Sequence, residues 1–340
     1  MSKPPVEVPQ GAIRFNSDSQ KMEFFAQDQW WEMATDNLKT EGGHRGLIMG
    51  GSSHTDTIEY ITISTAGNGQ DFGNLDDGAM LMSGCSSSTR GLGMGGRLSG
   101  GVQTKRIEHV TIQTLGGGIN FGDLTKTNDY GGIGNLGNQT RGMIQGGVNP
   151  GHSDADMGVD MNYVTIATQG NAVKFGECNI THTYSPALLS SPTRGLIAGG
   201  GNPGINTTEY ITIATTGNAI VFGELSGTGG QGAAGAASSV IGLVGGGYHG
   251  GSDQDRVDKF IIATTGNAID YGDLTRTSRW ICPLSDSIRA VWCGGYGPST
   301  DTIDYNVIAT GGAAVDFGNL TVSPASRGGM SGASSGHGGL

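Results

Sequence analysis

The sequence predicts an all-β fold in which one four-stranded unit is repeated six times. First, a Phe-Gly or Tyr-Gly pair recurs with spacings of 49, 54, 47, 49 and 46 residues. Second, Gly and Pro make roughly a fifth of the 340 residues, and Gly costs about 0.5–1 kcal/mol in a helix interior. Third, past residue 40 every stretch of a dozen residues contains Gly or Pro or lacks an apolar stripe of helical period. The aromatic residues of the recurring pairs are Phe72, Phe121, Phe175, Phe222, Tyr271 and Phe317.

Every copy follows one order of motifs. Arg-Gly comes first, then a short apolar run, Gly-Gly, a polar loop, an acid-Tyr-Ile-Thr-Ile-Ala-Thr segment, a Gly-Asn-Ala turn and Phe-Gly-acid-Leu. Chance does not produce six copies of so long a pattern, so the repeat organises the chain. Ile241 departs from it in place of the fifth arginine, Lys259 in place of the fifth tyrosine and His109 in place of the second. The first position of Arg-Gly is held by Arg45, Arg90, Arg141, Arg194, Ile241 and Arg289.

Each copy contains four short predicted strands, a to d. In the fourth copy, strand b covers residues 195–199, strand c 209–215 and strand d 219–225, and strand a is the small-residue run before Arg-Gly. The c strands carry β-branched residues on both faces, as expected for a sheet covered on both sides. Small residues in strand a, such as 83–85 and 233–236, predict a crowded axis where these strands converge.

Four strands at this period are typical of a propeller blade, so six copies predict a six-bladed β-propeller. The first copy lacks strand a, whereas residues 326–335 (SRGGMSGASS) look like a strand a without a blade. We therefore expect the C-terminal strand to complete the first blade and close the ring, which removes exposed strand edges. A β-solenoid is the structural alternative. The predicted domains are an N-terminal module, 1–40, and a propeller, 41–340, with blades 321–340 plus 41–75, 76–124, 125–178, 179–225, 226–274 and 275–320.

The N-terminal segment predicts a separate small β module. Residues 11–16 and 21–25 alternate around a polar turn, and residues 29–33 form a third strand. So small a sheet cannot bury four large aromatic side chains by itself. They either pack under the propeller or dock into another protein. These candidate docking residues are Phe24, Phe25, Trp30 and Trp31.

Charge and cysteine content exclude several classes of partner. The formal net charge is −11, with no Lys or Arg block, which argues against nucleic acid or an anionic membrane surface. No apolar run reaches transmembrane length. The four cysteines lie far apart without a C-x-x-C pair, which argues against a disulfide scaffold or a zinc ribbon and favours a reducing compartment.

Catalytic and metal motifs are mostly missing from the sequence. The seven histidines show no pair at ligand spacing, and neither a G-x-S-x-G nor a phosphate-loop motif occurs. We predict no catalytic residue and no cofactor. Asp154, Asp156 and Asp160 could converge on Ca²⁺, but Thr165 stands where a twelve-residue calcium loop carries an acid. A calcium site and a solvated acidic loop both remain open.

An acid or Asn precedes the strand c aromatic in every copy. A functional interpretation makes these residues a ring of ligands. A structural one has them pair with the arginine of Arg-Gly or cap backbone groups, and their recurrence favours it. The residues are Glu59, Glu108, Asn162, Glu209, Asp258 and Asp304.

The loops between strands b and c vary most. They range from residues 52–57 to residues 148–159, whereas the c–d turns are nearly constant. Variable loops on a rigid scaffold are where binding usually occurs, and their residue types suit sugars. The candidate ligand-binding residues are His152, Asp154, Asp156, Asp160, Tyr248, His249, Asp253, Asp255 and Tyr296.

Two parts of the chain resemble known proteins. Gly-Gly after strand b and an aromatic on strand d resemble kelch repeats, although Phe or Tyr stands where those usually carry Trp. Residues 11–16 (GAIRFN), followed by Glu and Trp, are similar to a module of tailed-phage fibre and other virion proteins. T-R-G, then I-E-Y-I-T-I-A-T-T-G-N-A and F-G-[DEN]-L, resembles a repeat of structural proteins from marine and cyanobacterial phages.

The resemblance implies a non-enzymatic structural protein of a phage particle, assembled in the host cytoplasm and associated with the tail or tail fibres. Its expected partners are other virion proteins, through residues 1–40, and a host-surface glycan; we expect neither nucleic acid nor membrane insertion. The alternatives are a lectin-like protein and a carbohydrate-active enzyme. The enzyme would require an unsymmetric cluster of acids, Tyr and Arg at the central channel.

Overall fold

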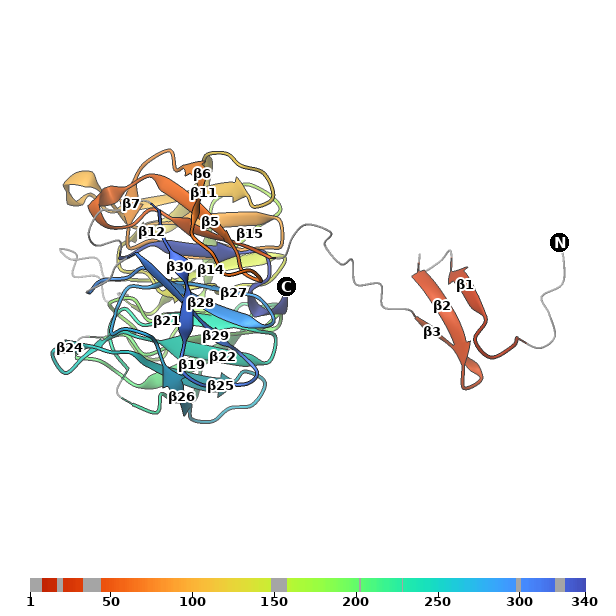
Figure 1. Ribbon diagram of the computed structural model, residues 1–340. Coiled ribbons are helices and arrows are strands. Elements are labelled where there is room, and N and C mark those ends of the chain that lie inside the picture. The colour runs from red at the N-terminus through yellow and green to blue at the C-terminus, as the bar shows by residue number, and fades with distance from the viewer. Residues whose placement is uncertain are drawn as a thin grey trace. The chain divides into compact units, whose positions relative to one another are not determined.

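The computed structural model describes residues 8–16, 21–32, 44–147, 158–201, 203–227, 229–297, 301–321 and 328–340. These residues form β-strands and three short 3-10 helices, η1 (Ser52–His54), η2 (Ser99–Gly101) and η3 (His337–Gly339). The all-β prediction is therefore confirmed. The chain divides into two compact units, Met1–Gly42 and Gly43–Leu340 (Figure 1). Within the described residues, no helix is long and apolar enough to span a membrane.

The N-terminal unit contains one antiparallel sheet in the order β1-β2-β3, which confirms the predicted hairpin with a third strand. Its strands are β1 (Ile13–Asn16), β2 (Lys21–Ala26) and β3 (Gln29–Glu32).

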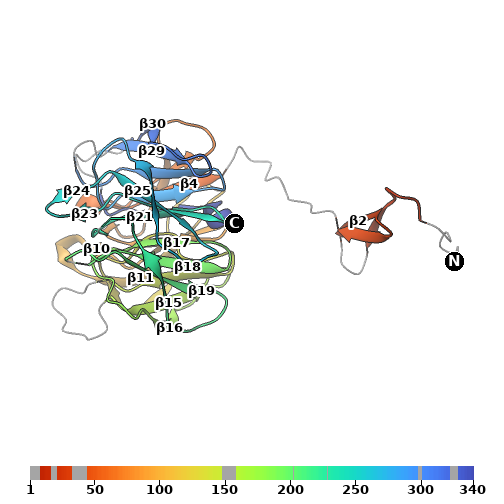
Figure 2. The same ribbon diagram turned by 90° about the horizontal axis from the view of Figure 1, so that it is seen from below.

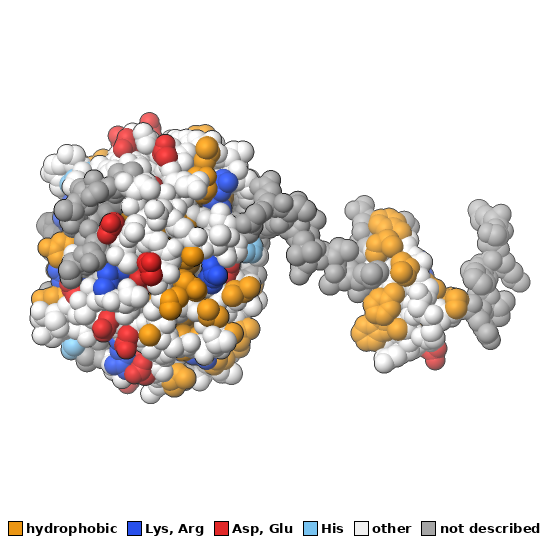
Figure 3. All heavy atoms as spheres, in the orientation of Figure 1, with side chains coloured by type: hydrophobic (Ala, Val, Ile, Leu, Met, Phe, Trp, Pro, Cys, Tyr) orange, Lys and Arg blue, Asp and Glu red, His pale blue; other side chains and the backbone are white. Residues whose placement is uncertain are grey.

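The two faces of this sheet differ. On one face, Ile13, Phe24 and Trp31 stand in one cross-strand row and Phe15 and Met22 in the next. All five side chains are exposed, and hydrophobic groups line the N-terminal unit in Figure 3. We call these five residues the apolar face.

On the opposite face, the side chains contact one another. Phe25 and Trp30 pack edge to face with ring centroids 5.3 Å apart, and the Arg14 guanidinium lies 4.1 Å from the Trp30 ring. Arg14 also pairs with Glu23 at 2.7 Å. Of the four predicted docking residues, only Phe24 and Trp31 therefore lie on the apolar face.

The larger unit consists of six antiparallel meanders, numbered along the chain. Meander one contains β31 (Ser331–Ser334), β4 (Arg45–Met49), β5 (Thr57–Thr62) and β6 (Gln70–Asn74). Meander two contains β8 (Ser83–Ser86), β9 (Arg90–Met94), β11 (Thr104–Thr111) and β12 (Ile119–Asn128). Meander three contains β14 (Arg141–Gln145), β15 (Asp160–Thr165) and β16 (Val173–Glu177), preceded by β13 (Ile133–Gly134).

The other three meanders follow the same order. Meander four contains β17 (Ala187–Ser190), β18 (Arg194–Ala198), β19 (Thr207–Thr212) and β20 (Ile220–Glu224). Figure 2 shows β17, β18 and β19 in succession. Meander five contains β21 (Ala234–Ala237), β22 (Ile241–Gly245), β25 (Arg256–Ile261) and β26 (Ile269–Asp273). Meander six contains β27 (Cys282–Ser285), β28 (Arg289–Cys293), β29 (Thr302–Val307) and β30 (Val315–Asn319). Two short ribbons pair β7 (Ala79–Met80) with β10 (Arg97–Leu98) and β23 (Tyr248–His249) with β24 (Ser252–Asp253).

Meander one combines strands from the beginning and from the end of the larger unit, Gly43–Leu340. β31 pairs antiparallel with β4, from Ser331 opposite Met49 to Ser334 opposite Gly46. The prediction that the C-terminal segment supplies the missing strand a is confirmed for these residues, whereas 322–327 lie outside the described part of the chain.

Strand a of meander three departs from the expected pattern. β13 pairs in parallel with β17 and β21, and it thereby joins meanders four and five into one nine-stranded sheet. Gly134 explains this arrangement, because a Cβ there would lie 1.8 Å from Leu188 O and 2.6 Å from Gly235 O. Similar approaches occur at Gly84 and Gly332, which confirms that small residues in the a strands are needed where these strands converge.

Hydrophobic packing occurs between meanders. The buried apolar residues form clusters, and two consecutive meanders supply nearly all residues of each cluster. Ile133 of β13 is the exception, because it joins the cluster of meanders five and six. Another cluster combines Ile48 and Ile61 of meander one with Val291 and Phe317 of meander six. The last meander is therefore packed against the first.

The arginine of Arg-Gly links each meander to the next. Its guanidinium stacks on the tyrosine of strand c, at 4.4–4.7 Å in meanders one, three, four and six, and donates to a carbonyl in the next c–d turn. At 2.7–2.9 Å the acceptors are Ile112 O for Arg45, Ile166 O for Arg90, Ile213 O for Arg141, Ile262 O for Arg194 and Ile63 O for Arg289.

Meander five achieves the same link with different residues. Ile241 replaces the arginine there, and the Tyr271 hydroxyl lies 2.8 Å from Val307 O and 2.7 Å from Ile308 O. Lys259, which replaces the tyrosine, lies over the Tyr271 ring. In meander five, Tyr271 thus takes over the contact that the arginine makes elsewhere, and Lys259 packs on Tyr271 in turn.

The glycine of the Phe-Gly pair is required by the next meander. A Cβ on it would lie 2.0–2.6 Å from a carbonyl oxygen in the following c–d turn. Sterics of this kind leave no room for any side chain. The pairs in contact are Gly73 with Gly116, Gly122 with Gly170, Gly176 with Gly217, Gly223 with Gly266, Gly272 with Gly312 and Gly318 with Gly67.

The repeated acids cap groups of the preceding meander, which confirms one of the two structural interpretations. Each accepts from an amide or hydroxyl in the last part of the preceding strand d or just after it, and in meander one that donor is Thr321, which follows meander six. The donors are Thr321 N to Glu59 (2.7 Å), Asp76 N to Glu108 (3.0 Å), Thr125 Oγ1 to Asn162 (2.6 Å), Asn179 N to Glu209 (3.1 Å), Ser226 N to Asp258 (3.0 Å) and Thr275 Oγ1 to Asp304 (2.6 Å).

Candidate binding site

The b–c and d–a connections lie at the same end of each meander, because its four strands alternate in direction. At this end, one residue shortly before each strand a has a φ of 52–72°. Left-handed backbone is strained for residues other than Gly and concentrates at functional sites. We call these residues the backbone collar: Leu81, Tyr130, Ser185, Gly232, Trp280 and Gly329.

Hydrogen bonds hold the collar in place. Along it, the amide of one member donates to the carbonyl of another. The bonds are Ser185 N to Tyr130 O (3.0 Å), Gly232 N to Ser185 O (3.0 Å), Trp280 N to Gly232 O (2.7 Å), Gly329 N to Trp280 O (2.9 Å) and Leu81 N to Gly329 O (2.6 Å). The collar thus fixes the backbone from which Tyr130 and Trp280 project.

Aromatic rings from several meanders meet around the collar. The Tyr130 centroid lies 5.5 Å from that of Tyr184 and 6.0 Å from that of Trp280, and Trp280 lies 5.7 Å from Tyr296. None of these side chains is fully buried. Together with Tyr248, they form what we call the aromatic cluster.

Two arginines stack on this cluster. The Arg279 guanidinium lies 4.2 Å from the Tyr248 ring, 4.8 Å from Trp280 and 4.7 Å from Tyr296. Arg97 lies 5.1 Å from the Tyr130 ring. Cation–π contacts of this kind hold the aromatic rings in fixed positions.

Each arginine also pairs with a carboxylate. Arg279 Nε lies 3.5 Å from Asp253 Oδ1, and Arg97 forms an ion pair with buried Asp129. Burial raises the pKa of both carboxyl groups, and the arginines oppose that rise. The cluster therefore combines apolar ring faces with two guanidinium groups.

Some predicted ligand residues belong to this cluster. Tyr248 and Tyr296 are members, and Asp253 reaches it through Arg279. Asp255 is half-buried, and its carbonyl accepts from Leu274 N at 2.6 Å.

The predicted calcium loop is only partly described. His152, Asp154 and Asp156 lie outside the described residues. Asp160 pairs with Lys126 at 3.0 Å and with Lys174 at 3.3 Å. Two ammonium groups thus neutralise this carboxylate.

Sequence reasoning missed most of the cluster. Tyr130, Tyr184, Arg279 and Trp280 lie in d–a connections, and Arg97 lies in β10. Variable length pointed to the b–c loops alone, although the d–a connections reach the same end of each meander. The topology of the predicted meander therefore could have indicated that residues of the d–a connections lie beside the b–c loops.

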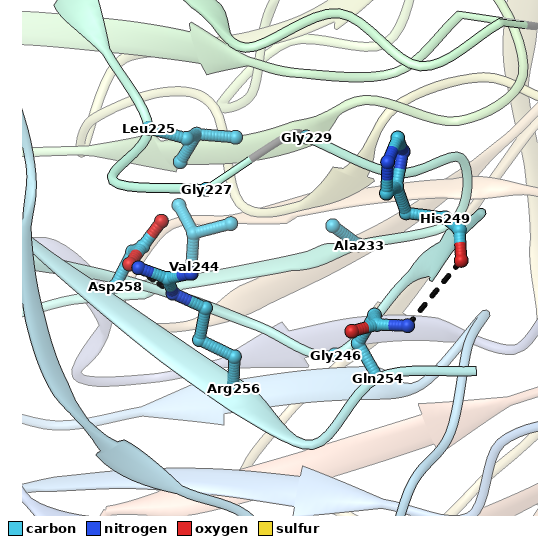
Figure 4. A pocket seen from close by; sticks show the side chains of 11 residues that line it. Leu225, Gly227, Gly229, Ala233, Val244, Gly246, His249, Gln254, Arg256 and Asp258 are labelled. Carbon is cyan, nitrogen blue, oxygen red and sulfur yellow. Dashed lines mark hydrogen bonds and ion pairs between the residues drawn. The ribbon is translucent and has the colours of Figure 1, made fainter. Parts of the chain in front are cut away.

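His249 lines a cavity of about 120 Å³ between meanders four and five (Figure 4). In it Arg256 Nε contacts Asp258 at 3.0 Å, and Gln254 Nε2 donates to His249 O at 3.4 Å. Saccharide-sized ligands need several times this volume.

The same position between meanders one and two holds a cavity of about 10 Å³, lined by Leu75, Arg106 and Glu108. Leu225, Arg256 and Asp258 hold the equivalent places in the larger cavity. Such a position, between the end of one strand d and strand c of the next meander, is here called a seam. Because the seam recurs, we interpret its cavities as a property of the repeat.

Comparisons with known proteins identify no family. The sequence matches no protein-family model, and it has no significant match among curated proteins. The likeness to kelch repeats and to phage virion proteins therefore rests on the motifs alone.

Proposed function

We propose that the six meanders form a closed six-bladed propeller. What supports this is the set of contacts between meanders six and one: the shared core, and the bonds from Arg289 to Ile63 O and from Thr321 to Glu59. In addition, β31, which follows meander six in the chain, is the first strand of meander one. The same types of contact join the other consecutive meanders. A solenoid would leave the first and last repeats without these partners.

We further propose that the protein is a non-enzymatic structural component of a phage particle, carried on the tail or its fibres. The apolar face of the N-terminal sheet would dock into another protein of the particle. The five large apolar side chains of this face are all exposed, and exposed apolar patches of that kind mark interaction sites.

The end of the propeller that carries the b–c and d–a connections would bind a saccharide of the host surface, and the aromatic cluster carries this proposal. Pyranose rings present apolar C–H faces that pack on aromatic rings, and guanidinium groups donate to hydroxyl or carboxylate oxygens. A glycosidase needs two carboxyl groups free to exchange protons and attack the substrate. Among the residues that the structure describes, the two carboxylates in contact with the arginines of this cluster are Asp253 and Asp129, and each is paired with its arginine. That pairing favours binding over hydrolysis.

Saccharide binding is tested with the double variant Tyr248→Ala/Tyr296→Ala. The wild-type protein should bind members of an array of bacterial surface saccharides, and the variant should bind them at least tenfold more weakly in calorimetry. The matched control is Leu115→Ala, whose exposed side chain lies in a c–d turn at the other end. Equal affinity in variant and wild type, or no binding by wild type across the array, would overturn the proposal.

Location on a particle is tested separately. Antibodies against residues 43–340 should label the tails of purified phage particles. Phe24→Ser/Trp31→Ser should abolish incorporation, whereas Leu115→Ala should not. Recovery of the wild-type protein only outside particles would overturn the structural role.

A further inference from the structure

The seam between meanders three and four contains a cysteine and a histidine at positions where the other copies carry neither residue. In five copies the Phe-Gly-acid motif ends with a buried leucine, whereas the third copy ends with Cys178. Four residues later the third copy has His182, where other copies have Ala79, Asn128, Gly229 and Ser278. The leucines are Leu75, Leu124, Leu225, Leu274 and Leu320.

Three potential ligand atoms converge in this seam. Donor atoms of Cys178, His182 and Glu209 all lie within 4.8 Å of one another. His182 and Glu209 are fully buried, and Cys178 is 5% exposed. Cys178 and His182 come from the connection between meanders three and four, and Glu209 lies on β19 of meander four.

Hydrogen bonds orient the histidine for metal binding. His182 Nδ1 lies 2.7 Å from Gly199 O, and a carbonyl oxygen only accepts, so Nδ1 carries its proton. The other ring nitrogen, Nε2, lies 3.1 Å from Glu209 Oε2. With the proton on Nδ1, the imidazole can offer Nε2 to a metal ion, and Nε2 and the Glu209 carboxylate are close enough to bind the same cation.

We propose that Cys178 Sγ, His182 Nε2 and the Glu209 carboxylate bind one Zn²⁺ ion. Sulfur, imidazole nitrogen and carboxylate oxygen are the donor types that zinc prefers, and a thiolate disfavours Mg²⁺ and Ca²⁺. The three side chains leave one tetrahedral position for a water molecule. The ion cross-links meanders three and four at the seam.

Proton release accompanies binding. Burial and the nearby charge of Glu209 raise the pKa of the Cys178 thiol. Zinc binds the thiolate and displaces its proton to solvent.

The test uses the full-length protein, loaded with ZnCl₂ and washed with a weak chelator. Elemental analysis should find about one zinc per chain, as expected for a single site. The key variant is Cys178→Leu, which installs the residue found in five other copies and so should fold. It should retain no zinc. Cys85→Ser, another buried free cysteine, is the matched control and should retain it.

Cobalt gives a second measurement. Co²⁺ should produce a thiolate-to-metal charge-transfer band with wild type and with Cys85→Ser, but not with Cys178→Leu. If Cys178→Leu does not fold, His182→Asn is measured with the same expectation. Zinc content near zero in washed wild type, or equal zinc in wild type and in the folded variant, would overturn the proposal.

Discussion

The two ends of each meander follow different rules. At the end with the c–d turns, the Arg-Gly, Phe-Gly and Gly-Asn motifs form the same contacts in successive meanders. At the other end, loop length varies and the aromatic cluster draws on individual residues such as Tyr130, Trp280 and Tyr296. The difference teaches that the repeat motif encodes contacts between neighbours, and that residues outside the motif are free to serve binding. Substitutions of motif residues should therefore cost stability, and substitutions of loop residues such as Tyr248 and Tyr296 should not.

Removal of residues 326–340 should have the largest effect. The variant loses β31, so β4 becomes an edge strand and the core shared by meanders one and six opens. We expect aggregation in size-exclusion chromatography and no cooperative thermal transition. A monomeric truncated protein with unchanged melting temperature would contradict this.

Gly318→Ala should cost about 2–4 kcal/mol, the range for steric overlap in a packed site. Its φ is 152°, and the added Cβ would lie 2.4 Å from Gly67 O in meander one. The control, Gly217→Ala, places a Cβ where nothing lies within 4 Å. Urea unfolding should show a large loss for the first variant and little change for the second. Equal losses would show that the contact does not constrain Gly318.

Acid should lower the free energy of unfolding, because it protonates the buried His337 at the end with the c–d turns. Its Nε2 lies 2.8 Å from Ser86 O in the a–b turn region, and burial lowers its pKa from 6.5 to about 4. The folded state therefore prefers neutral His337, and the stability present above pH 6.5 is lost as the pH falls toward 4, by about 3 kcal/mol. His337→Gln should flatten urea-unfolding stability between these pH values. An unchanged pH dependence in that variant would show that other groups cause the loss.

Tyr271→Phe should cost about 1 kcal/mol, the net value of a buried hydrogen bond. The variant restores the usual Phe, but without an arginine at 241 nothing then reaches Ile308 O in meander six. Adding Ile241→Arg should recover the loss in urea unfolding. Failure of this double variant would mean that the two residues do not substitute for each other.

The repeat made most of the fold predictable. Strand positions and the pairing of 331–334 with meander one follow from comparing the six copies. The same comparison favoured a structural role for the acids but left open whether they cap backbone groups or pair with the arginine of Arg-Gly. The aromatic cluster does not, because its rings come from d–a connections that lie far apart in the sequence. Glu209 shows a second limit: the repeat explains it fully, so its convergence with Cys178 and His182 becomes visible only in three dimensions.

The pairing of β31 with β4 has a consequence for synthesis. The strand that completes meander one follows meanders two to six in the chain, so the first meander must wait until residues 331–334 have been synthesised. Until then its unpaired edge is open to other chains, and chaperones or rapid release would have to protect it. A product shortened by premature termination or proteolysis never acquires this strand. Only chains that extend through Ser334 should therefore complete the first meander, so this one pairing makes the earliest strands depend on the presence of all the later meanders.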